Sequence, residues 1–364
     1  MDSVVRERID GVLKRQLTFS KDVHNLVALR IKVLANLATD EHSEPQDGKI
    51  IFDAPDGRRA DIRVSVVPTT QGEKIVLRLL VAQDSALTLE RLGMMGVDLD
   101  YLQKELDSSW GMVLVTGPTG AGKTTTLYAA LRQLNSDDVN IATIEDPAEY
   151  DLPGANQIQV NEKVGLSFAN GLRSIVRQDP DVILVGEIRD GETAGIAVNS
   201  AMTGHLVLST LHTNDAATAI PRLADMGVEP FLISSTLDVI VAQRLLRTVC
   251  PRCRKSEEVS VSDLKESLPP EMLKKLIGKK KTMRVYAGAG CKVCNNSGYY
   301  GRIGVFEVLR VDRTIEKLIM QNADAKVIRE AAVKAGMNTM IDDGIEKVKQ
   351  GLTTIDELLR VLSG

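Results

Sequence analysis

Residues 112–124 read MVLVTGPTGAGKT, and no other part of the chain constrains the fold as strongly. An apolar run, Met112–Thr116, leads into a complete G-x-x-x-x-G-K-[ST] loop, and the helix-forming stretch TTLYAALRQL follows it. A strand, a loop and a helix in this order favour phosphate binding, because the glycines let backbone amides face phosphate oxygens at a helix N-terminus. The stretch therefore predicts a nucleotide site. Its residues are Gly117, Pro118, Thr119, Gly120, Ala121, Gly122, Lys123, Thr124 and Thr125.

Two residues of this loop have distinct expected roles. Lys123 is expected to contact the β- and γ-phosphates, and Thr124 is expected to ligate Mg²⁺. No guanine-reading N-K-x-D motif follows the loop, so ATP is the favoured nucleotide.

Apolar runs alternate with helical stretches through the centre of the chain, a pattern typical of a parallel sheet covered by helices. The expected strands are Met112–Thr116, Asn140–Ile144, Asp181–Val185 and Leu206–Leu211. We predict an α/β protein whose P-loop core occupies residues 101–248. Residues 1–100 would form a small α/β domain and the beginning of a linker. The linker is expected to be helical over Leu87–Ser108, so its end overlaps the start of the core. Residues 249–310 would form a tetra-cysteine subdomain, and residues 311–364 a series of short amphipathic helices.

The first hundred residues carry signals of both helix and strand. Ser20 is the expected N-cap of a helix over Lys21–Leu37. A polar loop over Asp40–Lys49 should follow, then strands Ile62–Val67 and Ile75–Leu80 joined by a turn at Pro68–Glu73. The chain opens on VVRERIDGVL, which is typical of the middle of a sheet, so we expect N-terminal sequence to be missing.

Acidic residues follow two of the expected strands. Asp181–Val185 ends in Gly186–Glu187; glycine stands where many P-loop ATPases have aspartate, so Glu187 is expected to position the attacking water. Ligands bind at the carboxyl ends of parallel strands. The expected acidic contribution to Mg²⁺ binding therefore comes from Glu145, Asp146 and Glu149, for which surface salt bridges are the alternative interpretation.

Two histidines bracket the run Leu206–Leu211. His212, near its carboxyl end, is expected to sense the γ-phosphate or the attacking water. His205, at the other end, is expected to meet a neighbouring domain or subunit. Seven residues of extended chain separate the two by about 23 Å, so a shared metal is not expected.

The four cysteines form two C-x₂-C pairs, Cys250/Cys253 and Cys291/Cys294. Each pair can present two thiolates to one tetrahedral Zn²⁺, and a closed four-thiolate shell is structural. Disulfide bonding is the alternative, which a reducing compartment disfavours. The segment Arg252–Met283 is rich in Lys and Glu and poor in strand signals, and we interpret it as an insertion.

Composition excludes some classes of protein. Lys and Arg number 45 against 49 Asp and Glu, and aromatic residues are 3%. Neither value favours nucleic-acid binding, and the scarce aromatics argue against a base-stacking surface. No apolar run approaches the ~18 residues of a spanning helix, and the first residues lack a signal-peptide core. We expect a soluble, cytoplasmic protein.

Together these motifs resemble those of the type II secretion and type IV pilus assembly ATPases of the bacterial secretion ATPase superfamily. GPTGAGKTTTLYAAL looks like Walker A, TIEDPAEY like the Asp box, LRSIVRQDPDVILVGEIRD like an atypical Walker B, and TGHLVLSTLHTNDA like the His box. DIRVSVVPTTQGEKIVLRLL resembles the strand pair of the PAS-like domain that precedes the RecA-like core. CKVCNNSGYYGR resembles the Cys-rich segment of the secretion and pilus assembly members, which retraction ATPases generally lack.

The resemblance implies a homo-hexameric motor with ATP bound between the RecA-like core and the preceding domain. It also implies arginines that complete the site; by motif these are Arg63, Arg78, and Arg173 or Arg177. A guanidinium from a mobile domain or neighbour stabilises the charge on the γ-phosphate in the transition state. The implied partners are an inner-membrane platform protein and a membrane protein with a cytoplasmic domain, through which the motor would associate peripherally with the inner membrane.

Two other interpretations stay open. A RecA-like DNA-translocating ATPase shares the core, and fold alone does not determine function. A zinc-stapled scaffold would bind nucleotide without turnover. Stimulation by duplex DNA favours the first, and absence of turnover at every protein concentration favours the second. Secretion and pilus assembly are not separated by these residues.

Overall fold

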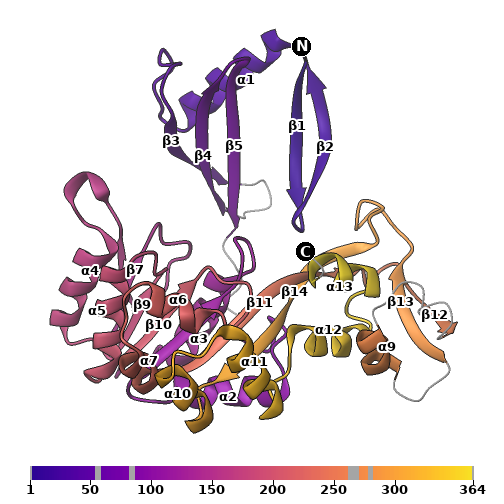
Figure 1. Ribbon diagram of the computed structural model, residues 1–364. Coiled ribbons are helices and arrows are strands. Elements are labelled where there is room, and N and C mark those ends of the chain that lie inside the picture. The colour runs from indigo at the N-terminus through magenta and orange to yellow at the C-terminus, as the bar shows by residue number, and fades with distance from the viewer. Residues whose placement is uncertain (1, 54–58, 82–86, 261–269, 278–281, 363–364) are drawn as a thin grey trace. The chain divides into compact units, whose positions relative to one another are not determined.

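The computed structural model describes residues 2–53, 59–81, 87–260, 270–277 and 282–362 (Figure 1). The chain divides into two compact units, residues 1–86 and 87–364. Each unit has a hydrophobic core of its own.

The N-terminal unit contains a β-hairpin and a three-stranded antiparallel sheet with one helix. The hairpin pairs β1 (Ser3–Ile9) with β2 (Val12–Phe19), and the sheet has the order β3 (Gln46–Asp53), β4 (Arg59–Thr69), β5 (Gly72–Val81). The strands expected at residues 62–67 and 75–80 are confirmed. The opening residues, interpreted as the middle of a sheet, form a separate two-stranded hairpin. The loop expected over Asp40–Lys49 is wrong in its second half, because β3 begins at Gln46. Burial alternates along β3, and Ile50 packs against the core, but most residues of the strand's first half are polar.

Helix α1 (Lys21–Leu34) begins where the sequence predicts. The Ser20 hydroxyl accepts a hydrogen bond from the Val23 amide, as an N-cap does. The helix ends before the predicted Leu37, because Asn36 adopts the left-handed conformation (φ 56°). Ala35, together with Val64 and Val66 of β4, forms the buried centre of this unit.

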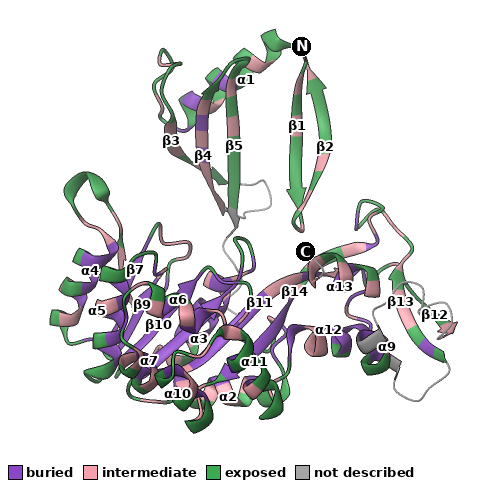
Figure 2. Cartoon of the chain, viewed as in Figure 1, coloured by how far each residue is buried: buried purple, intermediate pink, exposed green. Residues whose placement is uncertain are grey.

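The second unit is built on a seven-stranded sheet with the order β14-β11-β6-β10-β9-β7-β8. Its strands are β6 (Gly111–Thr116), β7 (Ile141–Glu145), β8 (Asn156–Gln159), β9 (Val182–Val185), β10 (Leu206–Leu211), β11 (Leu237–Val249) and β14 (Tyr299–Arg310). Neighbouring strands are parallel except for β14, which runs antiparallel to β11. The four strands expected from the sequence lie next to one another in the parallel part, which confirms the α/β prediction. Figure 2 shows these strands buried along their length.

Helices cover both faces of this sheet. On one face α2 (Gly96–Leu106) and α3 (Lys123–Leu134) contribute Leu106 and Leu131 to one core. The other face is covered by α4 (Phe168–Ile175), α5 (Gly191–Met202), α6 (Ala219–Asp225) and α7 (Pro230–Thr236). Short 3₁₀ helices lie at Glu162–Val164 and Val176–Gln178. Only the second half of the predicted linker helix, from Gly96, is helical.

An antiparallel ribbon extends from the region of the cysteines, and Met283 of its second strand is buried in the core. It pairs β12 (Arg254–Ser260) with β13 (Thr282–Gly288), beside α9 (Pro270–Ile277). The expectation that Arg252–Met283 lacks strands is therefore wrong in its described part; residues 261–269 and 278–281 of that segment lie outside the described residues. The side chains of Arg254–Glu258 are exposed, so the sequence has no apolar alternation from which this strand could be predicted.

The C-terminal helices predicted from residue 313 onward are confirmed. They are α10 (Arg313–Met320), α11 (Ala325–Lys334), α12 (Met340–Lys349) and α13 (Ile355–Leu362). Each buries an apolar side against the same core as α4 and α5. In the described part of the chain, no helix has both the length and the apolar character needed to cross a membrane.

Candidate nucleotide and metal sites

The glycine-rich loop joins β6, inside the sheet, to the N-terminus of α3. At Gly117 (φ 149°) a Cβ atom would lie 2.4 Å from the Gln243 carbonyl oxygen of β11, so the path of the loop requires glycine there. Gly122 (φ 89°) precedes the helix in the left-handed conformation. Pro118, Thr119 and Gly120 are exposed, and the free amides of the first helical turn lie beside them. This arrangement suits an anion such as a phosphate.

Lys123 lies over the loop. Its side chain is buried, and Nζ donates hydrogen bonds to the carbonyl oxygens of Gly117 (2.9 Å) and Pro118 (3.4 Å). Burial lowers the pKa of Lys123, and the negative charge of Glu187 opposes this. The ammonium group is therefore held at the loop and close enough to Glu187 to interact with it electrostatically.

Glu187 follows Gly186 at the carboxyl end of β9 and is the centre of a polar cluster. One carboxylate oxygen lies 2.5 Å from the Arg189 guanidinium, and the other lies 3.1 Å from Nε2 of His212, which follows β10. Arg189 also approaches Asp146, after β7, at 3.7 Å. Burial raises the pKa of Glu187, but Arg189 and His212 outweigh it and hold the pKa below its ordinary value. The carboxylate is thus ionised near neutral pH.

The three acids at the carboxyl end of β7 and just beyond it have different surroundings. Glu145 is buried, and its oxygens accept hydrogen bonds from the hydroxyls of Tyr128 and Thr143, both at 2.7 Å. The pKa of Tyr128 is raised chiefly by burial and secondly by the neighbouring Glu145 carboxylate. Asp146 is exposed and Glu149 half-buried. Glu145 therefore faces the interior, whereas Asp146 lies beside Arg189 and the water-positioning candidate Glu187.

The remaining core candidates make contacts elsewhere. Arg173 of α4 pairs with Glu192 of α5 at 2.5 Å. Arg177 donates to the Arg173 carbonyl oxygen at 2.7 Å. The contacts described for both arginines are made to α4 and α5 rather than to the glycine-rich loop. Nδ1 of His205 lies 2.9 Å from the Ser200 carbonyl oxygen in the last turn of α5.

Arg63 and Arg78 are direct cross-strand neighbours in the N-terminal unit. The register pairs Arg63 of β4 with Arg78 of β5, and on the other side with Lys49 of β3. Residues paired across strands share a face, so three cations form one row on the face opposite Val64 and Val66. Lys49 is neutralised by Asp61 at 2.6 Å. The sequence alone could not show that the two arginines lie side by side.

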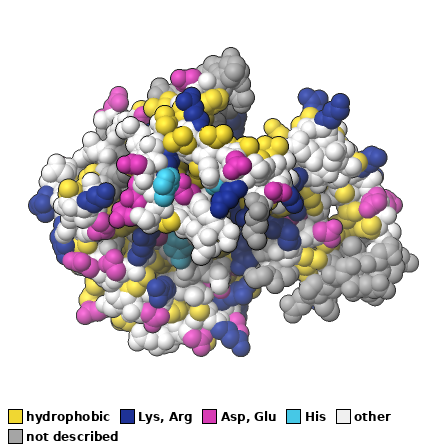
Figure 3. All heavy atoms as spheres, turned by 90° about the horizontal axis from the view of Figure 1, so that it is seen from above, with side chains coloured by type: hydrophobic (Ala, Val, Ile, Leu, Met, Phe, Trp, Pro, Cys, Tyr) yellow, Lys and Arg dark blue, Asp and Glu magenta, His cyan; other side chains and the backbone are white. Residues whose placement is uncertain are grey.

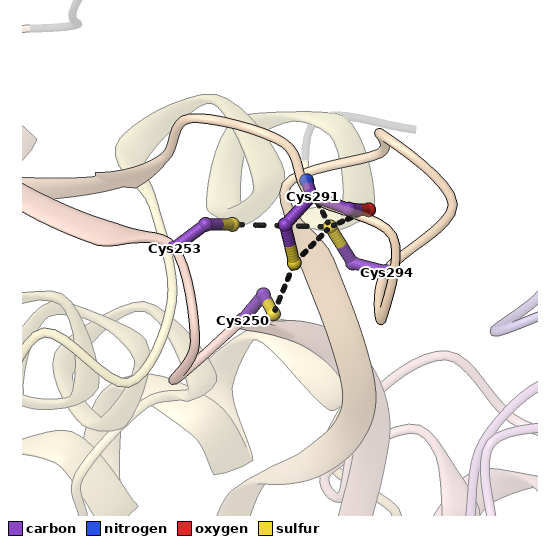
Figure 4. Close-up of side chains that lie close together, drawn as sticks. All are labelled: Cys250, Cys253, Cys291 and Cys294. Atoms are coloured by element: carbon purple, nitrogen blue, oxygen red, sulfur yellow. Dashed lines mark hydrogen bonds between the residues drawn. The ribbon is translucent and has the colours of Figure 1, made fainter.

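The four cysteines converge from two loops, with their sulfur atoms directed toward one centre (Figure 4). All four Sγ atoms lie within 4.8 Å of one another, and three pairs are separated by 3.6 to 3.9 Å. The edge of a tetrahedron with Zn–S bonds of 2.3 Å is about 3.8 Å. A disulfide needs about 2.05 Å, and the cysteines are free. The residues fit a metal bound by four thiolates.

Two residues beside the candidate nucleotide site were not predicted from the sequence. Arg189 stands within the quoted Walker B-like stretch, and its position two residues after Glu187 was the available signal. Gln243 is buried on β11 and accepts a hydrogen bond from Thr126 of α3 at 2.7 Å. No local pattern points to Gln243, because it meets the loop only through the pairing of β11 with β6.

Acidic and basic side chains are intermixed on the face drawn in Figure 3. This agrees with the formal net charge of −4.

The chain is similar to known proteins in sequence and in structure. The family described as "Type II/IV secretion system protein" matches residues 1–360. The type II secretion system ATPase E of Vibrio cholerae serotype O1 is 47% identical over 358 residues, which are 98% of this chain and 69% of that protein. The type IV pilus assembly ATPase PilB of Myxococcus xanthus is 44% identical over 360 residues, which are 98% of this chain and 62% of that protein.

Solved structures with the same fold include a pilus retraction motor and an ATPase. The pilus retraction motor PilT, crystallised with bound ADP, is 28% identical, with a TM-score of 0.64 over 98% of this chain and 89% of that one. The ATPase DotB of Legionella pneumophila has a TM-score of 0.68 over 98% of this chain and 90% of that one. At 20% identity DotB shows a likeness of fold alone.

Proposed function

The chain belongs to the type II/IV secretion system protein family, and on this premise we propose that it hydrolyses ATP at the Gly117–Thr125 loop to power assembly of a type II secretion pseudopilus or a type IV pilus. One observation carries the proposal. The carboxyl ends of adjacent parallel strands bring Glu187 and His212 together, 3.1 Å apart, with Lys123 in electrostatic range of Glu187.

Each of these groups has a proposed role in ATP hydrolysis. The amides of the loop and of the first turn of α3 hold the phosphates, and Lys123 moves from the loop carbonyls to the β- and γ-phosphates. Glu187 accepts a hydrogen bond from the water that attacks the γ-phosphorus, and the bond to the bridging oxygen of ADP breaks. His212, which contacts Glu187, is the proposed sensor of the γ-phosphate or of the attacking water.

Mg²⁺ fits the oxygen donors at this edge of the sheet. Thr124 would ligate it directly, and it would neutralise charge on the phosphates. Of the three acids, Asp146 and Glu149 suit a contribution through water, since both are accessible. Glu145 is better placed to support them, because its oxygens are held by Tyr128 and Thr143.

Arg63 and Arg78 are the proposed source of positive charge for the transition state. Their side-by-side placement supports this role, because two guanidiniums on one face can contact one phosphoryl group. Arg173 and Arg177 would join the site only after Arg173 leaves Glu192. A homo-hexamer is the assembly in which such arginines reach a neighbouring chain's site.

Proposed partners follow the family. They are an inner-membrane platform protein and a membrane protein with a cytoplasmic domain, so the motor would work in the cytoplasm, at the membrane only through these partners. No nucleic-acid partner is proposed.

Assembly should be visible in the rate of hydrolysis. Mg²⁺-ATP turnover per chain is expected to rise with protein concentration, because the site is completed only when chains associate. Steady-state phosphate release across a hundredfold range of concentration, with sizing of the same samples, measures this. Turnover absent throughout while ATP still binds would contradict the proposed function. A rate that stays flat while sizing shows only monomer would contradict assembly.

We propose zinc as the metal at the four cysteines. Each purified chain is expected to contain about one zinc, because four thiolates at tetrahedral spacing favour this ion. Cys294→Ser should lower the zinc content and destabilise residues 249–310, with Ser256→Ala on exposed β12 as the control. Mass spectrometry for metals and thermal unfolding measure both effects. Zinc well below one per wild-type chain would contradict the assignment.

A further inference from the structure

Glu307, on β14, is a buried carboxylate that the mechanism above does not use. Its side chain is 1% exposed. Oε1 accepts a hydrogen bond from the Ala216 amide at 3.2 Å. Among the described residues Oε2 has no hydrogen-bond partner, and the Arg329 guanidinium of α11 lies 4.0 Å away. A buried charge so incompletely satisfied costs stability, so a purely structural need would be met better by an apolar residue.

The loop that Glu307 holds, residues 212–218, leads to the nucleotide site. Its first residue, His212, contacts Glu187. The Thr213 hydroxyl lies 2.6 Å from the hydroxyl of Thr116, the last residue of β6 before Gly117. The Thr213 amide donates to the same Thr116 oxygen at 2.9 Å. The loop is therefore tied to the start of the glycine-rich loop at one end and to Glu307 at the other.

Glu307 also faces the C-terminal helices. Burial raises its pKa, while the amides of Ala216 and Met340 and the charge of Arg329 oppose the rise. Met340 begins α12, and the neighbouring Phe306 amide donates to Asp343 of the same helix at 2.8 Å. The strand at residues 306–307 thus joins the loop after β10 to the start of α12.

We propose that Glu307 is a positioning residue for ATP hydrolysis. By accepting the Ala216 hydrogen bond it keeps loop 212–218, and with it His212, in the arrangement that turnover requires, and it links this loop to α11 and α12. The proposal rests on the ATPase activity proposed above.

Two substitutions of similar volume test the role. Glu307→Gln keeps an oxygen acceptor for Ala216, whereas Glu307→Met removes it. Glu307→Met is expected to lower kcat for ATP about 10-fold or more with KM changed less than about twofold, because small displacements of catalytic groups carry large costs. Glu307→Gln should retain most of kcat. Wild-type kcat in a folded Glu307→Met variant, equal losses in both variants, or a change confined to KM would each overturn the proposal.

A second measurement applies if Glu307→Met does not fold. Hydrogen exchange of the wild-type chain is compared with and without Mg²⁺ and a non-hydrolysable ATP analogue. Protection is expected to change together in residues 212–218 and in the first turn of α12; a change in the loop alone would overturn the link. Absence of turnover in the wild-type chain would count against the ATPase proposal, whereas an active wild type with an unaffected Glu307→Met variant would count against Glu307 alone.

Discussion

Glu187→Gln is expected to lower kcat for ATP hydrolysis by about 10²- to 10⁴-fold while ATP binding is retained. Glutamine has the shape of glutamate but lacks its charge, so it neither polarises water nor pairs with Arg189 and His212. We propose that the loop and Lys123 hold the phosphates, and the change leaves both intact. Binding should therefore persist when turnover is lost.

The measurement combines two assays on one sample. Titration with ATP gives the dissociation constant, and phosphate release gives kcat. Glu346→Gln is the matched control, because it removes an exposed carboxylate that is paired with Lys349 at 2.7 Å and lies on α12. Turnover close to that of the wild type in Glu187→Gln would remove Glu187 from the water-positioning role. Loss of binding together with turnover would assign it to the phosphate site instead.

Arg78→Ala is expected to lower kcat by about 10³- to 10⁵-fold, the range measured for arginines that complete a phosphoryl-transfer site. Arg78 is exposed beside Arg63 in the N-terminal unit, so its loss should not disturb a core. Arg30→Ala, on exposed α1 of the same unit, is the control for charge removal. Unchanged turnover in Arg78→Ala would exclude this arginine from the site.

Mixing the two inactive variants tells whether Arg78 acts on its own chain or on a neighbour. If it reaches the neighbouring site, equal mixing of Glu187→Gln with Arg78→Ala chains leaves about a quarter of the interfaces of a head-to-tail ring complete. Activity should then reappear on mixing. If Arg78 serves its own chain, each chain keeps one defect in its own site and the mixture stays inactive.

Much of the fold could be predicted because its signals are local. Four parallel strands, the glycine-rich loop and the Ser20 cap each depend on a few consecutive residues, through side-chain periodicity, permitted φ angles or a hydroxyl near free amides. Strands β3 and β12 were missed for different reasons. The half-buried positions of β3 alternate but are mostly occupied by polar residues or glycine, and most side chains of β12 are exposed, so neither strand has an apolar alternation in its sequence. Segment type is thus predictable where burial and periodicity agree.

For the candidate nucleotide and metal sites, the proposed phosphate loop, the acid after β9 and the two cysteine pairs could all be found in the sequence, because spacing within a motif sets which groups can converge. Which polar side chains meet depends on the tertiary structure. It turned Glu145 toward Tyr128, placed Arg63 beside Arg78, and joined Glu307 to Ala216, 91 residues away. Such contacts depend on the register between distant strands and on burial, which raises the free-energy cost of an unpaired charge. Neither register nor burial can be predicted from a short stretch of residues.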